Sequence, residues 1–356
     1  MQKFITALLA AALWLGGPLA LAQSDIKLQD DAPDRYVVEK GDTLWGIAGK
    51  FLKDTWRWPG VWRMNQDQIK NPHWIYPGNV IILDRSVTPP QLRLSGSDSS
   101  RSDTVKLVPQ VRGESLTAEA IPPIPLKAIE PFLSQPLLIE EGGLDKAPRI
   151  IAIEENHVNL GPGGIAYVSG MSNAADSSLW QVYRPGRPLV DPDSNRTLGI
   201  EAVFLGTARM TRGGEPATVQ IVSSKQEIAA GDRLISALTP EISPYMPHAP
   251  RTSFRGRIIG LYNNFATSVG GRDSIISINR GARDGLEVGH VLAVYRNVVV
   301  VDQQNPLMSR DSAPTIKLPD ERYGLIFIFR TFNAVSYALV MESSRPIQPG
   351  DIVQTP

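Results

Sequence analysis

Residues 36–48 read YVVEKGDTLWGIA. The apolar run at the start, closed by Lys40-Gly41, predicts a short strand that ends in a turn. Asp42 or Thr43 stands where a helix N-cap is expected, because either side chain can accept a hydrogen bond from the first helical turn. An amphipathic helix with one buried face is predicted next, because apolar residues recur at i, i+3, i+4 and i+7: Leu44, Ile47, Ala48 and Phe51.

A second helix and a closing strand complete this unit. Pro59 suits the first turn of a helix that runs on through Val61 and Met64. The sequence IYPG at residues 75–78 predicts a tight turn, and VIIL at residues 80–83 predicts the strand that follows it. Together these elements predict a small α+β domain with the order strand, helix, helix, strand (βααβ).

This pattern resembles the LysM domain, a module that recognises polymers containing N-acetylglucosamine, chiefly peptidoglycan. The resemblance rests on residues 36–48, on Asn65 and on IYPGNVI at residues 75–81, and it covers residues 36–84. The segment KDTWRWP at residues 53–59 is longer and more aromatic than in the simplest members. This longer form resembles LysM domains of exported bacterial proteins, and it implies peptidoglycan or a related N-acetylglucosamine polymer as partner.

The resemblance also implies where a glycan would bind. In the family, the glycan lies in a shallow groove between the loop after the first strand and the loop before the second strand. Backbone N–H and C=O groups of such loops can bond the N-acetyl group, while an apolar floor receives its methyl. The residues carried over are Gly41, Asp42, Thr43 and Leu44 in the first loop and Ile75, Tyr76, Pro77 and Gly78 in the second.

The tryptophans of this region have two interpretations. Five of the seven lie between residues 36 and 83. They could stack on sugar rings, or they could fill the core of a small domain that has no disulfide. We favour packing, with Trp62 in the core and Trp45 covered by the inserted segment that holds Trp56 and Trp58.

Length and composition limit how many domains and which kinds of site the chain can contain. A length of 356 residues predicts two or three domains, and 42% hydrophobic residues suffice for packed cores. The 36 basic and 36 acidic side chains give a net charge of zero, so overall charge provides no reason to expect binding to nucleic acid. The absence of cysteine excludes disulfides, thiolate metal sites and cysteine nucleophiles. We expect no cofactor and no metal.

The amino terminus has the features of a secretory signal peptide. Lys3 precedes an almost wholly apolar stretch that ends at Gly17-Pro18, and Ala20-Leu-Ala22 fits the small-x-small cleavage rule. We therefore expect residues 1–22 to be removed and the mature chain to be periplasmic. The apolar stretch is too short to span a membrane comfortably, so no transmembrane segment is expected after cleavage.

The remaining residues divide by composition. Residues 86–120 are rich in Ser, Asp, Thr and Arg and predict a flexible linker. Residues 121–147 begin with the stiff sequence IPPIP and predict a docking segment with a short helix near 126–134. From about residue 148, short β-branched runs alternate with Gly, Pro and Asn, which is typical of β structure.

The β-rich part contains similar stretches twice, in the same order. RIIAI at 149–153 resembles RIIGL at 257–261, VYR recurs at 182–184 and 294–296, and IAAGD at 228–232 resembles IQPGD at 347–351. We therefore predict two tandem repeats, 148–240 and 255–356. A related pattern, aliphatic-x-x-Gly-polar-x-aliphatic, begins at Ile75, Ile228, Leu286 and Ile347, and each copy predicts a glycine turn that enters a strand.

Known catalytic signatures are absent from the sequence. GPGGIA at 161–166 formally matches a dinucleotide-binding fingerprint, but a strand pattern follows where a helix is required. The four histidines form no zinc-peptidase motif. A glycosidase needs only two carboxylates, so a wall hydrolase with its active site in 148–356 stays the alternative.

The sequence therefore predicts a non-catalytic, exported cell-wall-binding protein. Its LysM domain would tether a β-rich region that binds an envelope protein partner or acts as a scaffold.

Overall fold

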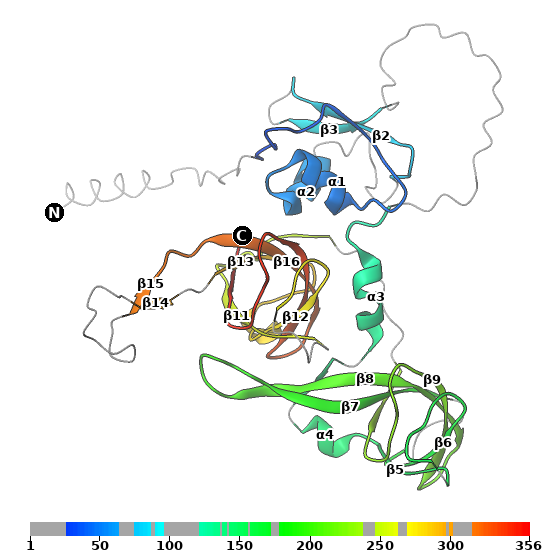
Figure 1. Cartoon of the computed structure of the whole chain (residues 1–356). Coiled ribbons are helices and arrows are strands. Elements are labelled where there is room, and N and C mark those ends of the chain that lie inside the picture. The colour runs from blue at the N-terminus through cyan, green and yellow to red at the C-terminus, as the bar shows by residue number, and fades with distance from the viewer. Residues whose placement is uncertain are drawn as a thin grey trace, which may run out of the picture.

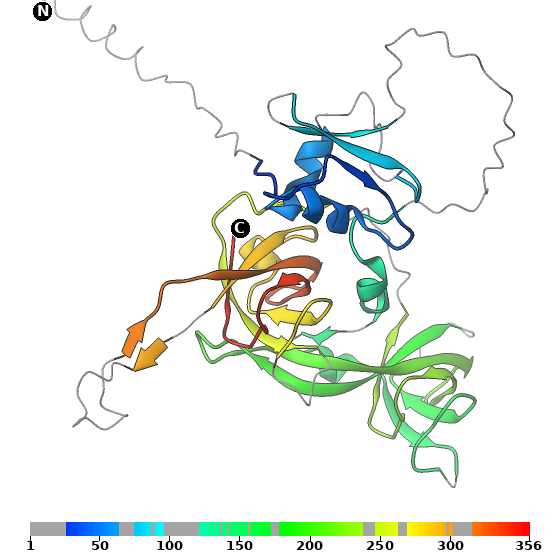
Figure 2. The same ribbon diagram turned by 45° about the horizontal axis from the view of Figure 1, so that its top comes forward.

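The structure, a computed structural model, describes residues 26–63, 75–86, 90–95, 121–135, 137–140, 142–155, 157–171, 178–237, 246–262, 269–296, 299–301 and 315–356. A small amino-terminal domain lies against a barrel built from residues 255–354, and another barrel, built from residues 149–236, lies beyond it at the far end of a long hairpin (Figures 1 and 2). The expected signal peptide, residues 1–22, lies outside the described residues.

The amino-terminal domain is a short antiparallel sheet with two helices on one face (Figure 1). Its elements are β1 (Arg35–Val37), α1 (Leu44–Phe51), a 3-10 turn η1 (Thr55–Arg57), α2 (Trp58–Arg63), β2 (Val80–Asp84) and β3 (Gln91–Leu94). The sheet order is β1-β2-β3. Thr43 is the N-cap of α1, because its hydroxyl accepts a hydrogen bond from the backbone N–H of Gly46 at 3.0 Å.

Strand β3 differs from the sequence expectation. It lies inside 86–120, which we expected to be a linker, and it pairs with β2 through Leu92 opposite Leu83. Leu92 is buried in the core shared with the helices, which explains why this short strand joins the sheet. Residues 96–120 lie outside the described part of the chain.

The docking segment contains the expected helix. Helix α3 (Leu126–Ser134) covers the predicted residues, and β4 (Leu138–Ile139) and α4 (Gly143–Lys146) follow it. Phe132 of α3 packs against Phe329 of the neighbouring barrel, with ring centroids 6.5 Å apart. Arg330 donates hydrogen bonds to the carbonyl oxygens of Phe132, at 3.0 Å, and Gln135. These carbonyls at the end of α3 are thereby satisfied by a cation, which complements the helix dipole.

The first barrel is built from residues 149–236. Its strands are β5 (Arg149–Ile153), β6 (Ile165–Ser169), β7 (Leu179–Val190), β8 (Thr197–Arg212), β9 (Ala217–Ser224) and β10 (Arg233–Ser236). They pair in the order β5-β6-β9-β8-β7-β10, and β10 returns to β5. All of these pairs are antiparallel, and β4 adds to the outer part of β8.

The second barrel is built from residues 255–354 and is closed. Its strands are β11 (Arg255–Leu261), β12 (Ile275–Ile278), β13 (Val291–Tyr295), β16 (Arg322–Thr331), β17 (Ser336–Ser343) and β18 (Ile352–Gln354). They pair in the order β11-β12-β17-β16-β13-β18, and β18 returns to β11. A 3-10 turn, η3 (Ala282–Asp284), follows β12, and a small hairpin of β14 (Val299–Val301) and β15 (Thr315–Lys317) projects from the barrel (Figure 1).

The second barrel is covered on its outside as well as filled on its inside. Along β16 and β17, alternate residues such as Ile326 and Val340 belong to the barrel interior. The residues between them, such as Phe327 and Leu339, join a second core that also contains Ile129 of α3 and the helices of the amino-terminal domain. The amino-terminal domain, α3 and this barrel therefore share one continuous apolar core.

The four glycine motifs form the same turn. In each, Gly78, Gly231, Gly289 or Gly350 has φ between +92° and +100°. The backbone N–H of the residue after the aliphatic position donates to the polar side chain three residues later, at 2.8 to 3.1 Å: Asn79, Asp232, His290 and Asp351. Strands β2, β10, β13 and β18 begin directly after these polar residues. The prediction of glycine turns that enter strands is confirmed.

Among the helices in the described part of the chain, none has the length and apolar character needed to cross a membrane.

Candidate functional site

The two loops carried over from the LysM pattern lie side by side. The N–H of Gly78 donates to the carbonyl of Val38 at 2.8 Å, and the N–H of Val38 donates to the carbonyl of Asn79 at 2.9 Å. These bonds extend the pairing of β1 with β2 beyond the sheet. The loop that follows β1 and the loop that precedes β2 therefore form the two sides of one site.

The first loop contains a fifth copy of the glycine turn, which sequence analysis missed. Val38 and Leu44 are its buried aliphatic residues, and Gly41 has φ +99°. The N–H of Glu39 donates to Asp42 Oδ2 at 2.8 Å, as in the other four turns. The signal was present in the sequence VEKGDTL at 38–44, but here the turn leads into a helix instead of a strand.

Asp42 also orients a tyrosine of β1. The hydroxyl of Tyr36 donates to Asp42 Oδ2 at 2.9 Å. Burial and this hydrogen bond to a carboxylate raise the pKa of Tyr36 to about 12. Asp42 therefore accepts hydrogen bonds from the loop backbone and from Tyr36, while Thr43 caps the helix.

The predicted site residues differ in exposure. Gly41, Pro77 and Gly78 are exposed, and Asp42, Thr43 and Tyr76 are half-buried. Leu44 and Ile75 are buried, which fits an apolar floor between the two loops. The structure thus places all eight predicted residues in two adjacent loops.

Residues 121–123 lie between the loops. The N–H groups of Leu44 and Trp45 donate to the carbonyls of Pro122 and Pro123, each at 3.0 Å. The N–H of Ile121 donates to the carbonyl of Ile75 at 2.8 Å. The sequence predicts a docking segment here, but nothing in it indicates that residues 121–123 contact the two loops.

Two tryptophans of the amino-terminal domain are packing residues, and Trp56 lies half-buried against the same core. Trp45 and Trp58 are buried, with 2% and 0% of their surfaces exposed. The indole N–H of Trp45 donates to Glu342 Oε1 of β17 at 3.0 Å, so the second barrel contributes to its cover. The packing prediction is confirmed for these two; the Trp62 side chain and Trp74 lie outside the described atoms.

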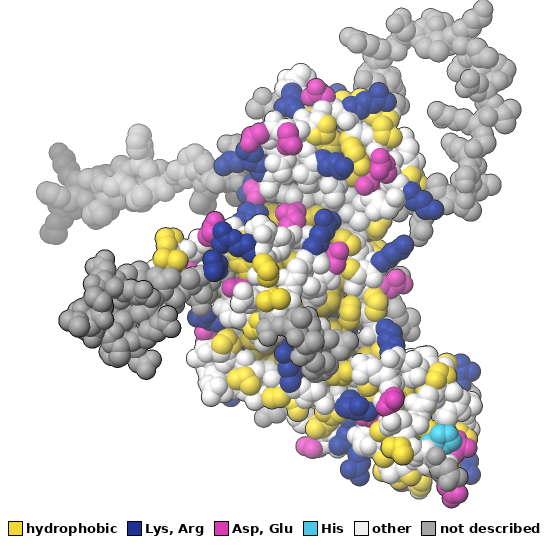
Figure 3. Space-filling view, viewed as in Figure 1, with side chains coloured by type: hydrophobic (Ala, Val, Ile, Leu, Met, Phe, Trp, Pro, Cys, Tyr) yellow, Lys and Arg dark blue, Asp and Glu magenta, His cyan; other side chains and the backbone are white. Residues whose placement is uncertain are grey.

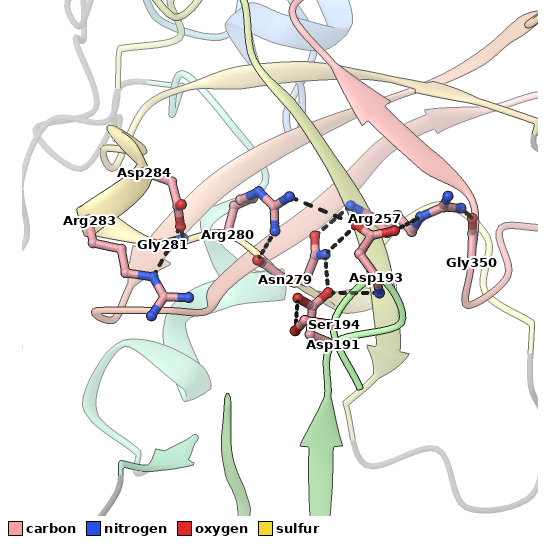
Figure 4. Close-up of polar contacts among 10 residues, drawn as sticks. All are labelled: Asp191, Asp193, Ser194, Arg257, Asn279, Arg280, Gly281, Arg283, Asp284 and Gly350. Carbon is pink, nitrogen blue, oxygen red and sulfur yellow. Dashed lines mark hydrogen bonds and ion pairs between the residues drawn. The ribbon is translucent and has the colours of Figure 1, made fainter. Parts of the chain in front are cut away.

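The best-defined pair of neighbouring carboxylates in the β-rich region is structural. The turn between β7 and β8 contains Asp191 and Asp193, which both bind the second barrel (Figure 4). The side-chain amide of Asn279 donates to both carboxylates, and Arg257 donates to Asp193 at 2.6 Å. Burial opposes ionisation of Asp191, but hydrogen bonds from Asn279 and Ser194 prevail and lower its pKa. A glycosidase acid requires a raised pKa, so Asp191 is unsuited to that role.

His248, Glu287 and His290 bring their possible ligand atoms within 4.8 Å of one another. The N–H of Glu287 donates to Nδ1 of His290 at 3.1 Å, so the neutral ring carries its proton on Nε2. Neither nitrogen of His290 then offers a free lone pair, and the set is not prepared for a metal. His290 acts instead as the polar residue of a glycine turn.

This role predicts a pH dependence of stability. Burial and then the neighbouring His248 lower the pKa of His290, while Glu287 opposes the shift. Because the unfolded chain takes up the proton first, the free energy of unfolding should fall as pH drops below about 6.5. His290→Asn keeps the acceptor, as Asn79 shows in its own turn, and removes the titration. Urea unfolding at about pH 7.5 and about pH 5 should show a smaller loss in the variant; equal losses would contradict this assignment.

Charges are mixed on the visible surface. On the face drawn in Figure 3, Lys and Arg side chains alternate with Asp and Glu over the amino-terminal domain and both barrels. This face offers no extended basic patch of the kind that nucleic acid requires.

A short antiparallel sheet is backed by two helices, and the loop that leaves β1 lies beside the loop that enters β2. Comparison with known families agrees: the LysM domain model matches residues 36–84. Residues 36–84 are a LysM domain. The chain is also 45% identical over 56 residues to the uncharacterized protein YqbP of Bacillus subtilis (strain 168), an alignment that covers 13% of this chain and 26% of the relative. The chain thus matches about a quarter of the length of that relative. LysM domains in general bind peptidoglycan and other N-acetylglucosamine glycans.

Proposed function

We propose that this protein is a non-catalytic peptidoglycan-binding protein of the periplasm. The LysM domain would hold the chain on the wall through the groove formed by residues 41–44 and 75–78. The observation that carries this proposal is the LysM match, together with the hydrogen bonds that hold these two loops side by side. Residues 1–22 would direct export and then be removed.

We also propose that residues 148–240 and 255–356 are two copies of one module. Taken in chain order, the six strands of each barrel pair in the same sequence, first-second-fifth-fourth-third-sixth. The three sequence matches fall at corresponding places, in β5 and β11, at β7 and β13, and before β10 and β18. Asp232 and Asp351 close equivalent turns.

The barrels would bind an envelope protein or hold such proteins in an assembly. Ile151, Tyr167 and Val222 are each at least 36% exposed and lie on the adjacent strands β5, β6 and β9. Exposed apolar side chains on the outer face of a sheet are candidates for protein contacts. The role of the LysM domain would be to place this surface at the wall.

Sedimentation with purified sacculi tests the tether. The mature chain should sediment with sacculi, and a soluble N-acetylglucosamine oligomer should release it because the oligomer occupies the same groove. A glucose oligomer of equal length, which lacks the N-acetyl group, is the matched control and should have no effect. Binding that neither oligomer affects would place the contact outside the LysM groove and contradict the proposal.

A further inference from the structure

Residues 121–123 of the same chain are held between the two loops that were carried over as the glycan site. Three backbone hydrogen bonds join residues 121–123 to the facing loops: Leu44 N–H to Pro122 O, Trp45 N–H to Pro123 O, and Ile121 N–H to Ile75 O. Two of these three loop positions, Leu44 and Ile75, are residues carried over as glycan contacts. The segment therefore uses backbone groups of the proposed glycan site itself.

The chemistry of the segment matches that of the sugar substituent. An N-acetyl group is a secondary amide with one N–H donor, one C=O acceptor and a methyl group. Residues 121–123 present the same elements: the N–H of Ile121, the carbonyls of the two prolines, and apolar side chains in place of the methyl. Donors and acceptors that satisfy a peptide amide equally satisfy an acetamido group.

The segment is built to stay in the groove. Ile121 and Ile124 are 3% and 0% exposed, and both belong to the core that contains Leu44, Ile75 and the helices of the domain. The rings of Pro122 and Pro123 fix φ at both positions, so little conformational entropy is lost when the segment is bound. Neither proline has an N–H that would be left without a partner.

The segment is also tied to the second barrel. Four residues after Pro122 the chain enters α3, whose end is held by Arg330 of β16. The LysM domain touches the same barrel directly, through Trp45 with Glu342 and through Asp54 with Arg322 at 3.0 Å. The bound segment therefore links the groove to the docked position of the domain.

We infer that residues 121–124 are an internal ligand of the LysM groove, which an N-acetylglucosamine glycan must displace in order to bind. This inference rests on the proposed glycan-binding function. Binding to the wall then frees the segment, and it loosens the connection between the LysM domain and the second barrel. The apparent affinity of the intact chain is then the affinity of the open groove multiplied by the fraction of molecules whose groove is open.

A single cysteine reports on displacement. The chain has no cysteine, so the thiol of an Ile121→Cys variant is the only one, and it should react slowly with a maleimide while the segment is bound. The N-acetylglucosamine pentamer should accelerate labelling as it displaces the segment. Val340→Cys, at a fully buried site inside the second barrel, is the control and should label slowly with or without the pentamer.

An opened groove should bind the glycan more tightly. Calorimetry with the pentamer should show affinity for the Ile121→Ser/Ile124→Ser variant higher than for the unaltered chain by about tenfold or more. Ile150→Ser removes a buried isoleucine from the first barrel and should leave the affinity unchanged. If the double variant does not fold, the labelling experiment on Ile121→Cys decides alone.

The outcomes separate the two proposals. Faster labelling with the pentamer, together with tighter binding by the opened variant, supports the internal ligand. Equal affinity of the two forms with unchanged labelling overturns the internal ligand and leaves glycan binding intact. If the pentamer binds neither form, glycan binding itself fails, and the internal ligand fails with it.

Discussion

Gly206→Ala is expected to open the first barrel between β8 and β9. A Cβ atom at this position would lie 2.1 Å from the backbone carbonyl oxygen of Ser223 and 2.9 Å from Cα of Ser224. Both contacts are with backbone, so no side-chain rotation relieves them. We expect a loss of about 3 kcal/mol or more in the free energy of unfolding, the upper range for overpacking in a close-packed core.

Hydrogen exchange measures this effect where it occurs. Amides of β8 and β9 should lose protection in Gly206→Ala, while those of the LysM domain keep it because the two regions belong to different apolar cores. Gly161→Ala is the matched control in the same barrel, since its Cβ meets no atom within 4 Å. It should change stability by less than about 0.5 kcal/mol. Equal protection in both variants would show that β8 and β9 do not pair as described.

Tyr337→Ala is expected to detach the docking segment from the second barrel. The ring of Tyr337 is fully buried and packs edge-on against Tyr262 and Phe332, at centroid distances of 6.0 and 5.9 Å. Its hydroxyl donates to the carbonyl of Leu137 at 2.8 Å. Truncation removes the ring and leaves that buried carbonyl without this donor. We expect a loss of about 3–5 kcal/mol in the free energy of unfolding.

Tyr337→Phe separates the two contributions. It keeps the ring and removes only the hydroxyl. The Leu137 carbonyl still accepts the N–H of Ala202 at 2.9 Å, so the expected loss is about 0.5–1.5 kcal/mol, the net value of one hydrogen bond. Urea unfolding gives both values, and limited proteolysis after α3 should be fast in the alanine variant and slower in the phenylalanine variant. Equal losses in the two variants would mean that ring packing against Tyr262 and Phe332 contributes nothing.

Features that depend on a few adjacent residues were predictable from the sequence. The glycine turns need only a residue that tolerates positive φ and a nearby acceptor, and both are visible in short motifs such as IYPGN at 75–79. Thr43 caps its helix through a residue three positions away. Helix α3 was foreseen because apolar residues recur along residues 126–134. The LysM domain is recognisable because its motifs are local in this sense.

Features that depend on distant partners were not predictable. Glu342 receives the hydrogen bond of Trp45 across 297 residues of sequence. Strand β3 has only four residues and follows Pro89-Pro90, so only its pairing with β2 reveals it. The occupied groove is the clearest case, because IPPIP at 121–125 resembles a stiff linker until the loops around 44 and 75 are placed beside it. No local pattern specifies such a contact.

Sedimentation followed by a release assay distinguishes a wall tether from a wall hydrolase. The mature chain is incubated with purified sacculi, the sacculi are sedimented, and the same supernatant is assayed for released muropeptides. A non-catalytic LysM tether predicts that the protein is found in the pellet and that no muropeptides are released. Release of muropeptides that is abolished by one acidic substitution within residues 148–356 would contradict this account, because the β-rich region would then be a wall hydrolase.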